Sequence, residues 1–176
     1  MAEYQTTMNT GKVFESCIQR SAPDYVLVYR IPDAAQSFGG SKLTRFSRKN
    51  PFDYIFWDSR NHRLYAIELK TVSGHSISFE RSKGESGEIH YHQIEGLKKW
   101  NEYDGITCGF IIEFRDKELT FFLDIESFDS LINQIDKKSF NLSDLEKTGV
   151  PYTVIPQERL RTKYKYDLEI LFTLDK

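Results

Sequence analysis

Apolar residues along the first third of the chain follow two different spacings. Between Val13 and Ile18 they recur at helical spacing, which predicts a helix over residues 10–21. Residues 25–31 (YVLVYRI) are β-branched and aromatic, and this composition predicts a strand that Pro32 ends. The chain therefore begins with a predicted helix and a predicted strand.

Two further apolar runs, residues 53–57 and 64–72, flank the polar turn 58–63. Because both runs are apolar at nearly every position, we expect central strands that are covered on both faces. The other expected elements are a helix over 90–103, strands over 105–114 and 119–125, and a helix over 126–135. Over residues 166–174 the pattern does not separate strand from helix. This order of elements predicts an α/β fold with a mixed central β-sheet flanked by helices.

The segment between the first two predicted strands, residues 33–50, predicts an exposed, protruding basic loop. It contains Gly39-Gly40, several serines and, over residues 42–49, four cations with no acidic residue. This composition fits a solvated surface loop. It equally fits a segment whose cations neutralise phosphates while Phe46 stacks at an open base step, as in the unpaired centre of branched DNA.

Charge and cysteine usage narrow the class of protein. The net charge of −2 excludes a basic nucleic-acid coat and a polybasic membrane binder. Residues 1–50 carry seven basic and four acidic side chains, whereas residues 116–146 carry three and eight, so DNA binding must be local. The two cysteines are too far apart for a CxxC site. With no apolar run of membrane-spanning length and no secretion signal, we expect no membrane association and a cytoplasmic protein.

Ionisable residues stand inside the two apolar runs of the central hairpin. Glu68 and Lys70 are two positions apart on a predicted strand, so their side chains leave the same face. If Trp57 pairs with Leu64, the same register pairs Asp53 with Glu68. The sequence therefore predicts that two carboxylates and one amine converge.

Two interpretations of this cluster remain open from the residues alone. Glu68 and Lys70 can form an ion pair at a strand end, with Asp53 capping the turn after Pro51. Alternatively, a divalent cation compensates the facing carboxylates, and Mg²⁺ or Mn²⁺ is the natural candidate. Such an ion activates a water and polarises a phosphodiester, while Lys70 orients that water, which favours phosphodiester hydrolysis.

Seven short motifs occur one after another along residues 10–125. They are G-K-V-F-E (11–15), Y-R-I-P (29–32), T-R-F-S-R-K-N-P-F-D-Y (44–54), A-I-E-L-K-T (66–71), S-I-S-F (76–79), H-Q-I-E-G-L (92–97) and T-F-F-L (120–123). Together they resemble the RecU-type Holliday junction resolvases of the restriction-endonuclease-like, PD-(D/E)xK nuclease superfamily. The resemblance implies one nuclease domain over residues 1–176, with a core at about 10–125 and a basic stalk at about 33–50.

The resemblance also implies an activity and its partners. We expect a metal-dependent, structure-selective endodeoxyribonuclease that uses Mg²⁺ or Mn²⁺. It would act as a homodimer on branched DNA, cleaving four-way junctions by paired nicks during recombination and repair. Two alternatives stay open: a mobile-element nuclease of the same fold that acts on flaps or ends, and a non-catalytic DNA-binding recombination module. The presence of Glu15, Asp53, Glu68 and Lys70 together argues against the second alternative, the non-catalytic module.

The resemblance assigns a role to individual positions. Asp53 and Glu68 would be metal ligands, with Glu15 on the first helix as an additional acidic ligand. Lys70 would orient the attacking water, and Gln93 would lie close to the catalytic centre. DNA contacts are expected from Arg30, Lys42, Arg45, Phe46, Arg48 and Lys49.

Overall fold

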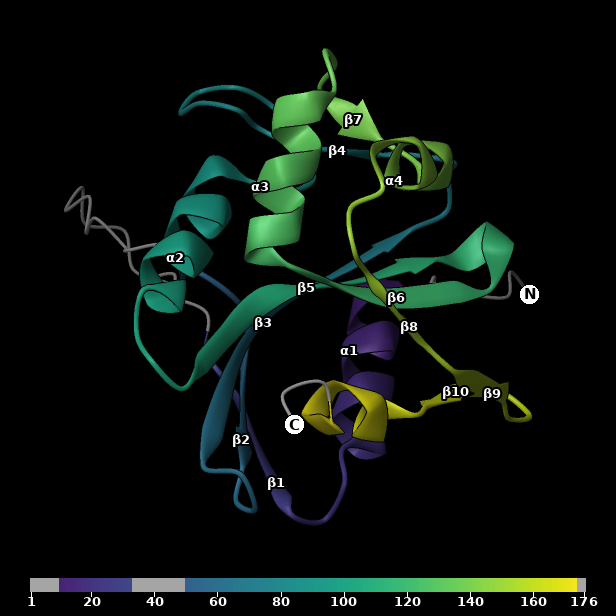
Figure 1. Cartoon of the computed structure of the whole chain (residues 1–176). Helices are drawn as coiled ribbons and strands as arrows, with labels where there is room; N and C mark the ends of the chain where they lie inside the picture. The colour runs from purple at the N-terminus through teal and green to yellow at the C-terminus, as the bar shows by residue number, and fades with distance from the viewer. Residues whose placement is uncertain (1–9, 33–49, 174–176) are drawn as a thin grey trace, which may run out of the picture.

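The computed structural model describes residues 10–32 and 50–173, which build a six-stranded mixed sheet with helices on both faces (Figure 1). All neighbouring strands are antiparallel except β3 and β5, which are parallel. The predicted fold class, an α/β fold with a mixed central sheet, is confirmed. In sheet order the strands are β1 (Val26–Arg30), β2 (Tyr54–Asp58), β3 (Arg63–Val72), β5 (Ile106–Phe114), β6 (Leu119–Asp124) and β8 (Thr153–Ile155).

Helices cover the two faces unequally. One face carries α1 and a C-terminal 3₁₀ helix, η2, and the other carries α2, α3 and α4 (Figure 1). Their bounds are α1 Thr10–Ser21, α2 Tyr91–Asn101, α3 Ile125–Gln134, α4 Leu142–Thr148, η1 Arg115–Lys117 and η2 Leu168–Thr173. Two small strand pairs complete the described part, β4 (Ile77–Ser78) with β7 (Ser139–Phe140), and β9 (Gln157–Arg159) with β10 (Tyr164–Tyr166).

Strand β3 lies in the middle of the molecule and is covered on both faces. Tyr65 and Ile67 belong to the core beneath α1, whereas Ala66 and Val72 belong to the core beneath α2 and α3. Successive side chains of a strand leave opposite faces, so a strand between two cores must be apolar at nearly every position. Glu68 is the charged exception within this buried run.

The predicted elements agree with the structure in kind and closely in extent. The helix predicted over residues 10–21 is α1, and the other seven predicted elements end within two residues of the observed bounds. The segment over 166–174 is divided between β10 and η2. Residues 33–49 of the predicted protruding loop lie outside the described residues, and with them the predicted DNA contacts Lys42, Arg45, Phe46, Arg48 and Lys49.

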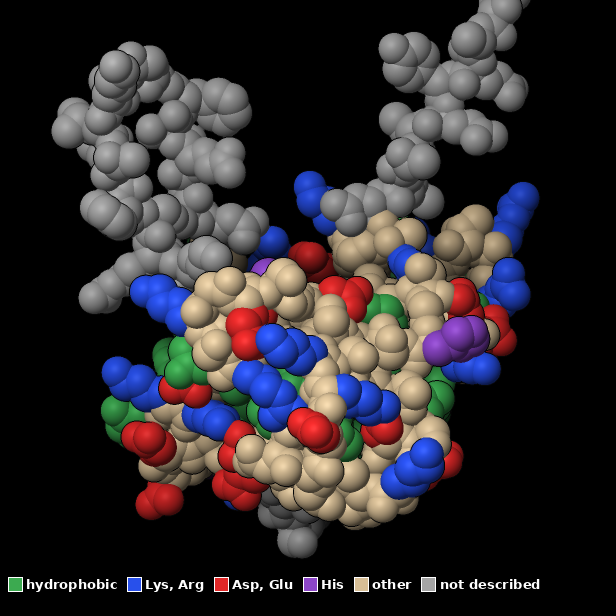
Figure 2. All heavy atoms as spheres, turned by 90° about the horizontal axis from the view of Figure 1, so that it is seen from above, with side chains coloured by type: hydrophobic (Ala, Val, Ile, Leu, Met, Phe, Trp, Pro, Cys, Tyr) green, Lys and Arg blue, Asp and Glu red, His purple; other side chains and the backbone are tan. Residues whose placement is uncertain are grey.

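The surface over α2, α3 and α4 carries both signs of charge. Figure 2 shows basic and acidic side chains lying beside one another on this face. In the part of the chain that is described, no helix combines the length and apolarity needed to cross a membrane.

Candidate active site

The β2–β3 hairpin has the predicted register. Trp57 lies opposite Leu64 and Tyr54 lies opposite Ile67, so Asp53, one residue before β2, lies next to Glu68. The backbone N–H of Leu69 donates to Asp53 Oδ2 at 3.4 Å. The Asp53 carboxylate is therefore turned towards β3 at the level of Glu68.

Glu68 is the most deeply buried carboxyl group of this cluster, with 2% of the residue exposed. Its Oε1 accepts from the side-chain amide of Gln93 and lies 2.9 Å from Lys70 Nζ. Its Oε2 is also buried and receives no hydrogen bond from an N–H or O–H donor among the described residues, while the Asp53 carboxyl group lies within hydrogen-bond reach of Glu68. Burial raises the pKa of Glu68 to about 8, and the Asp53 charge adds to the increase while Lys70 opposes it.

Burial also raises the pKa of Asp53. The Leu69 N–H and the Lys70 ammonium counteract this increase, and the Glu15 carboxylate reinforces it. Two adjacent carboxyl groups with raised pKa values mark a place where negative charge is insufficiently compensated. A cation in that place would stabilise both ionised carboxylates.

Helix α2 holds Gln93 against β3. The N–H of His90, at the helix N-terminus, donates to Gln93 Oε1 at 2.9 Å, so the same side chain joins the helix start to Glu68. Glu80, almost fully buried, in turn accepts from the N–H of Tyr91 at 2.8 Å and pairs with His90 Nδ1 at 2.8 Å. Glu80 is a residue that the sequence reasoning missed, because nothing in its spacing ties it to the start of a helix ten residues later.

The chain before Asp53 packs directly on α2. The Phe52 ring meets the Trp100 ring edge-on, with centroids 4.9 Å apart. A Cβ atom at Gly96 would overlap Pro51, so the absence of a side chain there permits the close approach. This contact fixes the distance between α2, which carries Gln93, and the segment that leads through Asp53 into β2.

Glu15 approaches the cluster from the α1 side. Its Oε2 lies 3.2 Å from Arg30 Nε and accepts from the Tyr54 hydroxyl at 3.5 Å. Burial, assisted by the Glu15 charge, raises the pKa of Tyr54 to about 12. Arg30, predicted to contact DNA, is thus paired with Glu15 in this structure.

The predicted site residues Glu15, Asp53, Glu68, Lys70 and Gln93 all lie around one end of the β2–β3 hairpin. Within residues 10–32 and 50–173, however, no group of three or more His, Cys, Asp or Glu side chains is arranged to hold a metal ion. The three-carboxylate ligand set therefore stays a prediction.

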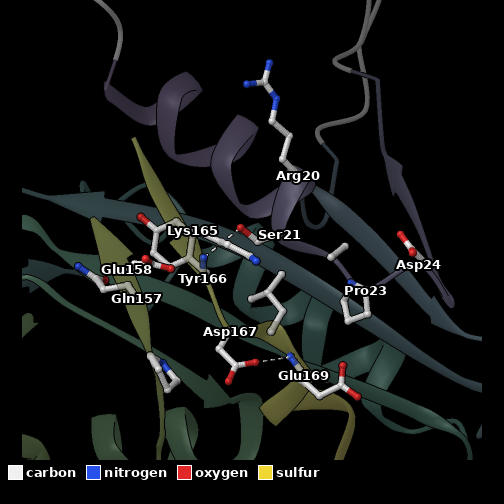
Figure 3. A pocket seen from close by; sticks show the side chains of 13 residues that line it. Arg20, Ser21, Pro23, Asp24, Gln157, Glu158, Lys165, Tyr166, Asp167 and Glu169 are labelled. Atoms are coloured by element: carbon white, nitrogen blue, oxygen red, sulfur yellow. Dashed lines mark hydrogen bonds between the residues drawn. The ribbon is translucent and has the colours of Figure 1, made fainter. Parts of the chain in front are cut away.

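A cavity of about 600 Å³ lies elsewhere, between the end of α1 and the chain around β10 (Figure 3). The Tyr166 N–H donates to Ser21 Oγ at 3.0 Å at its border. Its charged lining residues are Arg20 and Lys165 against Asp24, Glu158, Asp167 and Glu169. This excess of acidic groups disfavours phosphate, and none of the predicted site residues lines the cavity.

A mixed sheet with an acidic cluster between its central hairpin and its crossover helix defines a protein of the restriction-endonuclease-like class. The model of the family "Recombination protein U" (RecU) matches residues 57–170, which is more than half of the chain. The chain belongs to this family, and the resemblance drawn from the seven motifs is confirmed. The matched part contains Glu68, Lys70 and Gln93 and begins after Asp53.

Individual relatives add two comparisons. The chain is 32% identical over 151 residues to the SPbeta prophage-derived uncharacterized protein YotM of Bacillus subtilis (strain 168), covering 83% of this chain and 72% of that protein. Among solved structures it is similar to Archaeoglobus fulgidus Hjc, a Holliday junction resolvase from an archaeal hyperthermophile. That match has a TM-score of 0.48 and 12% identity, and covers 77% of this chain and 91% of that chain.

Proposed function

We propose that this protein is a metal-dependent endonuclease that cleaves four-way DNA junctions by paired nicks during recombination and repair. Membership of the Recombination protein U family supports the junction as substrate. The observation that carries the proposal is the buried Glu68 carboxyl group, which has one unpartnered oxygen and lies beside Asp53 and Lys70. A purely structural ion pair needs no unpartnered oxygen and no second carboxylate.

The donor set suits a hard divalent cation. Asp53 and Glu68 would hold Mg²⁺ or Mn²⁺, with Glu15 as an additional acidic group close enough to raise the pKa of Asp53. The unpartnered Glu68 Oε2 is the atom that most needs such a ligand. When bound, the ion would supply a polarised phosphodiester and an activated water.

The remaining side chains have distinct tasks in this proposal. Lys70, whose ammonium lies 2.9 Å from Glu68, would orient the attacking water and stabilise the negative charge that develops on the phosphate. Gln93 holds the Glu68 carboxylate in one orientation from α2. Glu68 is thereby fixed from two sides before any substrate arrives.

The four-way junction that we propose as the substrate also determines which partner the chain needs. A four-way junction has two-fold symmetry, and paired nicks require two active sites related by that symmetry, so we propose a homodimer. The cations of residues 42–49 would neutralise phosphates near the junction centre, with Phe46 stacking on an open base step.

Substitution of either carboxylate tests the active site. We expect Asp53→Ala and Glu68→Ala to abolish cleavage of a labelled four-way junction while junction binding in EDTA stays nearly intact. Removing a carboxylate costs metal affinity but also reduces the repulsion of phosphate. Glu146→Ala, an exposed carboxylate on α4, is the matched control and should cleave normally. Cleavage at the wild-type rate by Asp53→Ala or Glu68→Ala would refute the assignment.

A mobile-element nuclease that acts on flaps or ends is the second candidate. The specific observation in its favour is the relative from a prophage, YotM. Four-way junction, flap and linear duplex substrates, each incubated with Mg²⁺ and with EDTA, separate the candidates. Preferred cleavage of the junction supports the resolvase, preferred cleavage of flaps supports the alternative, and cleavage of none supports a non-catalytic DNA-binding module.

A further inference from the structure

Within the described part of the chain the six-stranded sheet ends at β1 on one side and at β8 on the other, and the two edges are built differently. Strand β8 has three residues and is closely bracketed by Pro151 and Pro156, both exposed. Short strands and prolines prevent an edge from pairing with another chain. Strand β1 has five residues (VLVYR) and contains neither proline nor lysine. The β8 edge is therefore protected against pairing, whereas the β1 edge has no such protection among residues 10–32 and 50–173.

The backbone of β1 directs alternate residues outward. The N–H of Ile31 donates to Asp53 O at 2.8 Å, and the N–H of Ser59 donates to Tyr25 O at 3.2 Å. Odd-numbered residues of this strand therefore bond to β2. In an antiparallel ladder the intervening residues face the other way, so the N–H and C=O of Val28 point away from β2.

Two large apolar side chains are exposed on the same strand. Leu27 is 66% exposed and Tyr29 is 54% exposed. They stand two positions apart, on the sheet face that also carries Ile55 and Trp57 of β2. An unprotected edge that also exposes apolar side chains is typical of a surface that another strand covers.

We propose that β1 is the interface with a second copy of this chain, paired antiparallel about a two-fold axis at Val28. Val28 is the middle residue of the strand, so the two strands overlap along their full length only with the axis in this position. The Val26 N–H already donates to Pro23 O at 2.9 Å, so the ladder would consist of the Val28 pair and of the Arg30 N–H bonded to the C=O of Val26 in the other copy. This register places Leu27 opposite the partner's Tyr29, an aromatic–aliphatic pair of the kind that stabilises neighbouring strands. The inference rests on the proposed function, because it assigns a surface to the homodimer that paired nicking requires.

The position of the axis has a consequence for the two candidate active sites. A two-fold axis between antiparallel strands is perpendicular to the sheet, so the faces that carry Glu68 in both copies point the same way. Asp53 lies opposite Ile31, three residues from Val28 and one strand further in. With about 3.4 Å per residue and about 4.8 Å between strands, the two Asp53 residues would lie about 25 Å apart. Both sites could then act on one DNA molecule.

Cysteine cross-linking tests this register. In the double variant Leu27→Cys/Tyr29→Cys, the new thiol at position 27 of one copy lies opposite the new thiol at position 29 of the other. These two positions form a pair that is not hydrogen-bonded, whose Cα atoms lie about 4.5 Å apart, so a disulfide can form between them. We expect a disulfide-linked dimer under mild oxidation, seen on a non-reducing gel. The native Cys17 and Cys108 are buried and do not compete. The matched double variant Val154→Cys/Leu160→Cys, also at exposed positions, should stay a single chain.

Sedimentation of Leu27→Lys/Tyr29→Lys provides the second measurement, with Val154→Lys as control. We expect the wild type to be dimeric and the double variant to have a dimer dissociation constant raised about tenfold or more. A double variant that stays as dimeric as the wild type overturns the proposal. A double variant that loses only DNA affinity also overturns it, because Leu27 and Tyr29 would then contact DNA. If the cross-linked protein is a dimer like the wild type but cleaves no DNA, the proposed nuclease activity is refuted, whereas the proposed interface is supported.

Discussion

Glu68 and Glu113 are both buried glutamates on the paired strands β3 and β5, and their hydrogen bonds differ. Glu113 accepts from the Thr71 hydroxyl at 2.6 Å and from the Tyr166 hydroxyl at 2.7 Å, so each of its oxygens has a donor. Glu68 has donors on one oxygen only. A buried carboxylate with all partners is part of the core, whereas one that lacks a partner is suited to bind something further.

The raised pKa of Glu68 predicts a pH-dependent stability of the metal-free protein. The folded protein keeps a proton up to about pH 8 that the unfolded chain releases near its ordinary pKa of 4.5. Stability is therefore highest below pH 4.5 with respect to this group, and it falls as the pH rises to about 8. For one proton, a pKa difference of 1 between the folded and unfolded states corresponds to about 1.4 kcal/mol, so the loss amounts to a few kcal/mol at most.

Glu68→Gln, which stays neutral, should lack this loss. Urea unfolding in EDTA between pH 4.5 and 9 checks it: the stability of the variant relative to the wild type should increase with pH and level off above about pH 8. A constant difference between the two proteins across this range would contradict the burial of an ionisable Glu68. Added Mg²⁺ should stabilise the wild type more than Glu68→Gln, because a cation stabilises the ionised carboxylate.

At the scale of elements, the start of α2 links Glu80 to the candidate site. Glu80→Ala removes the acceptor of the Tyr91 N–H and the partner of His90 Nδ1 at the start of α2. We expect the single-turnover cleavage rate to fall about tenfold, because a displaced Gln93 no longer orients Glu68. Junction affinity should stay unchanged.

Glu85→Ala is the matched control for this prediction. Glu85 lies on the same loop and pairs with Lys138 at 2.8 Å, away from α2. Its cleavage rate should equal that of the wild type. An equal reduction in both variants would mean that the loop as a whole, and not the Glu80 contact, affects cleavage.

Local patterns explain which elements could be predicted from the sequence. Helix α1 and the β2–β3 hairpin depend on spacing within a few residues, so periodicity locates them and even fixes the opposition of Asp53 and Glu68. The short strands β7 to β10 could not be predicted, because two or three residues carry no period. Strand β8 exists through pairing with β6, where Thr120 meets Ile155 from a distant part of the chain. The contact of Glu80 with α2 likewise depends on tertiary packing that spacing does not encode.

At the scale of the whole molecule, the basic segment 33–49 is attached beside the candidate active site. Its flanking residues are joined by a hydrogen bond from Asn50 Nδ2 to Pro32 O at 2.7 Å, and Ile31 bonds to Asp53. We expect Phe46→Ala to reduce cleavage of four-way junctions far more than binding of linear duplex. Stacking at an open base step contributes about 1–3 kcal/mol per base and has no counterpart on a closed helix.

Charge variants of the same segment separate shape recognition from general attraction. Arg45→Ala with Arg48→Ala and Lys49→Ala should weaken binding to every DNA shape and reduce the salt dependence by up to about three charges. If Phe46→Ala gives equal losses on junction and duplex, the segment does not enter the junction centre, and the protein is a nuclease without that selectivity.

The parallel pairing of β3 with β5 also bears on how the molecule forms. Leu64 pairs with Ile106, so the chain must close a long crossover through α2 before this ladder exists. The β2–β3 hairpin, with Asp53 and Glu68, is a local structure that can assemble early, whereas Gln93 arrives only with the crossover. Non-local pairings form slowly because loop closure costs entropy before contacts repay it. For the endonuclease proposed above, the complete cluster of Asp53, Glu68 and Gln93 would therefore form only after the crossover has closed, and a partly synthesised chain that carries both carboxylates would not yet cleave DNA.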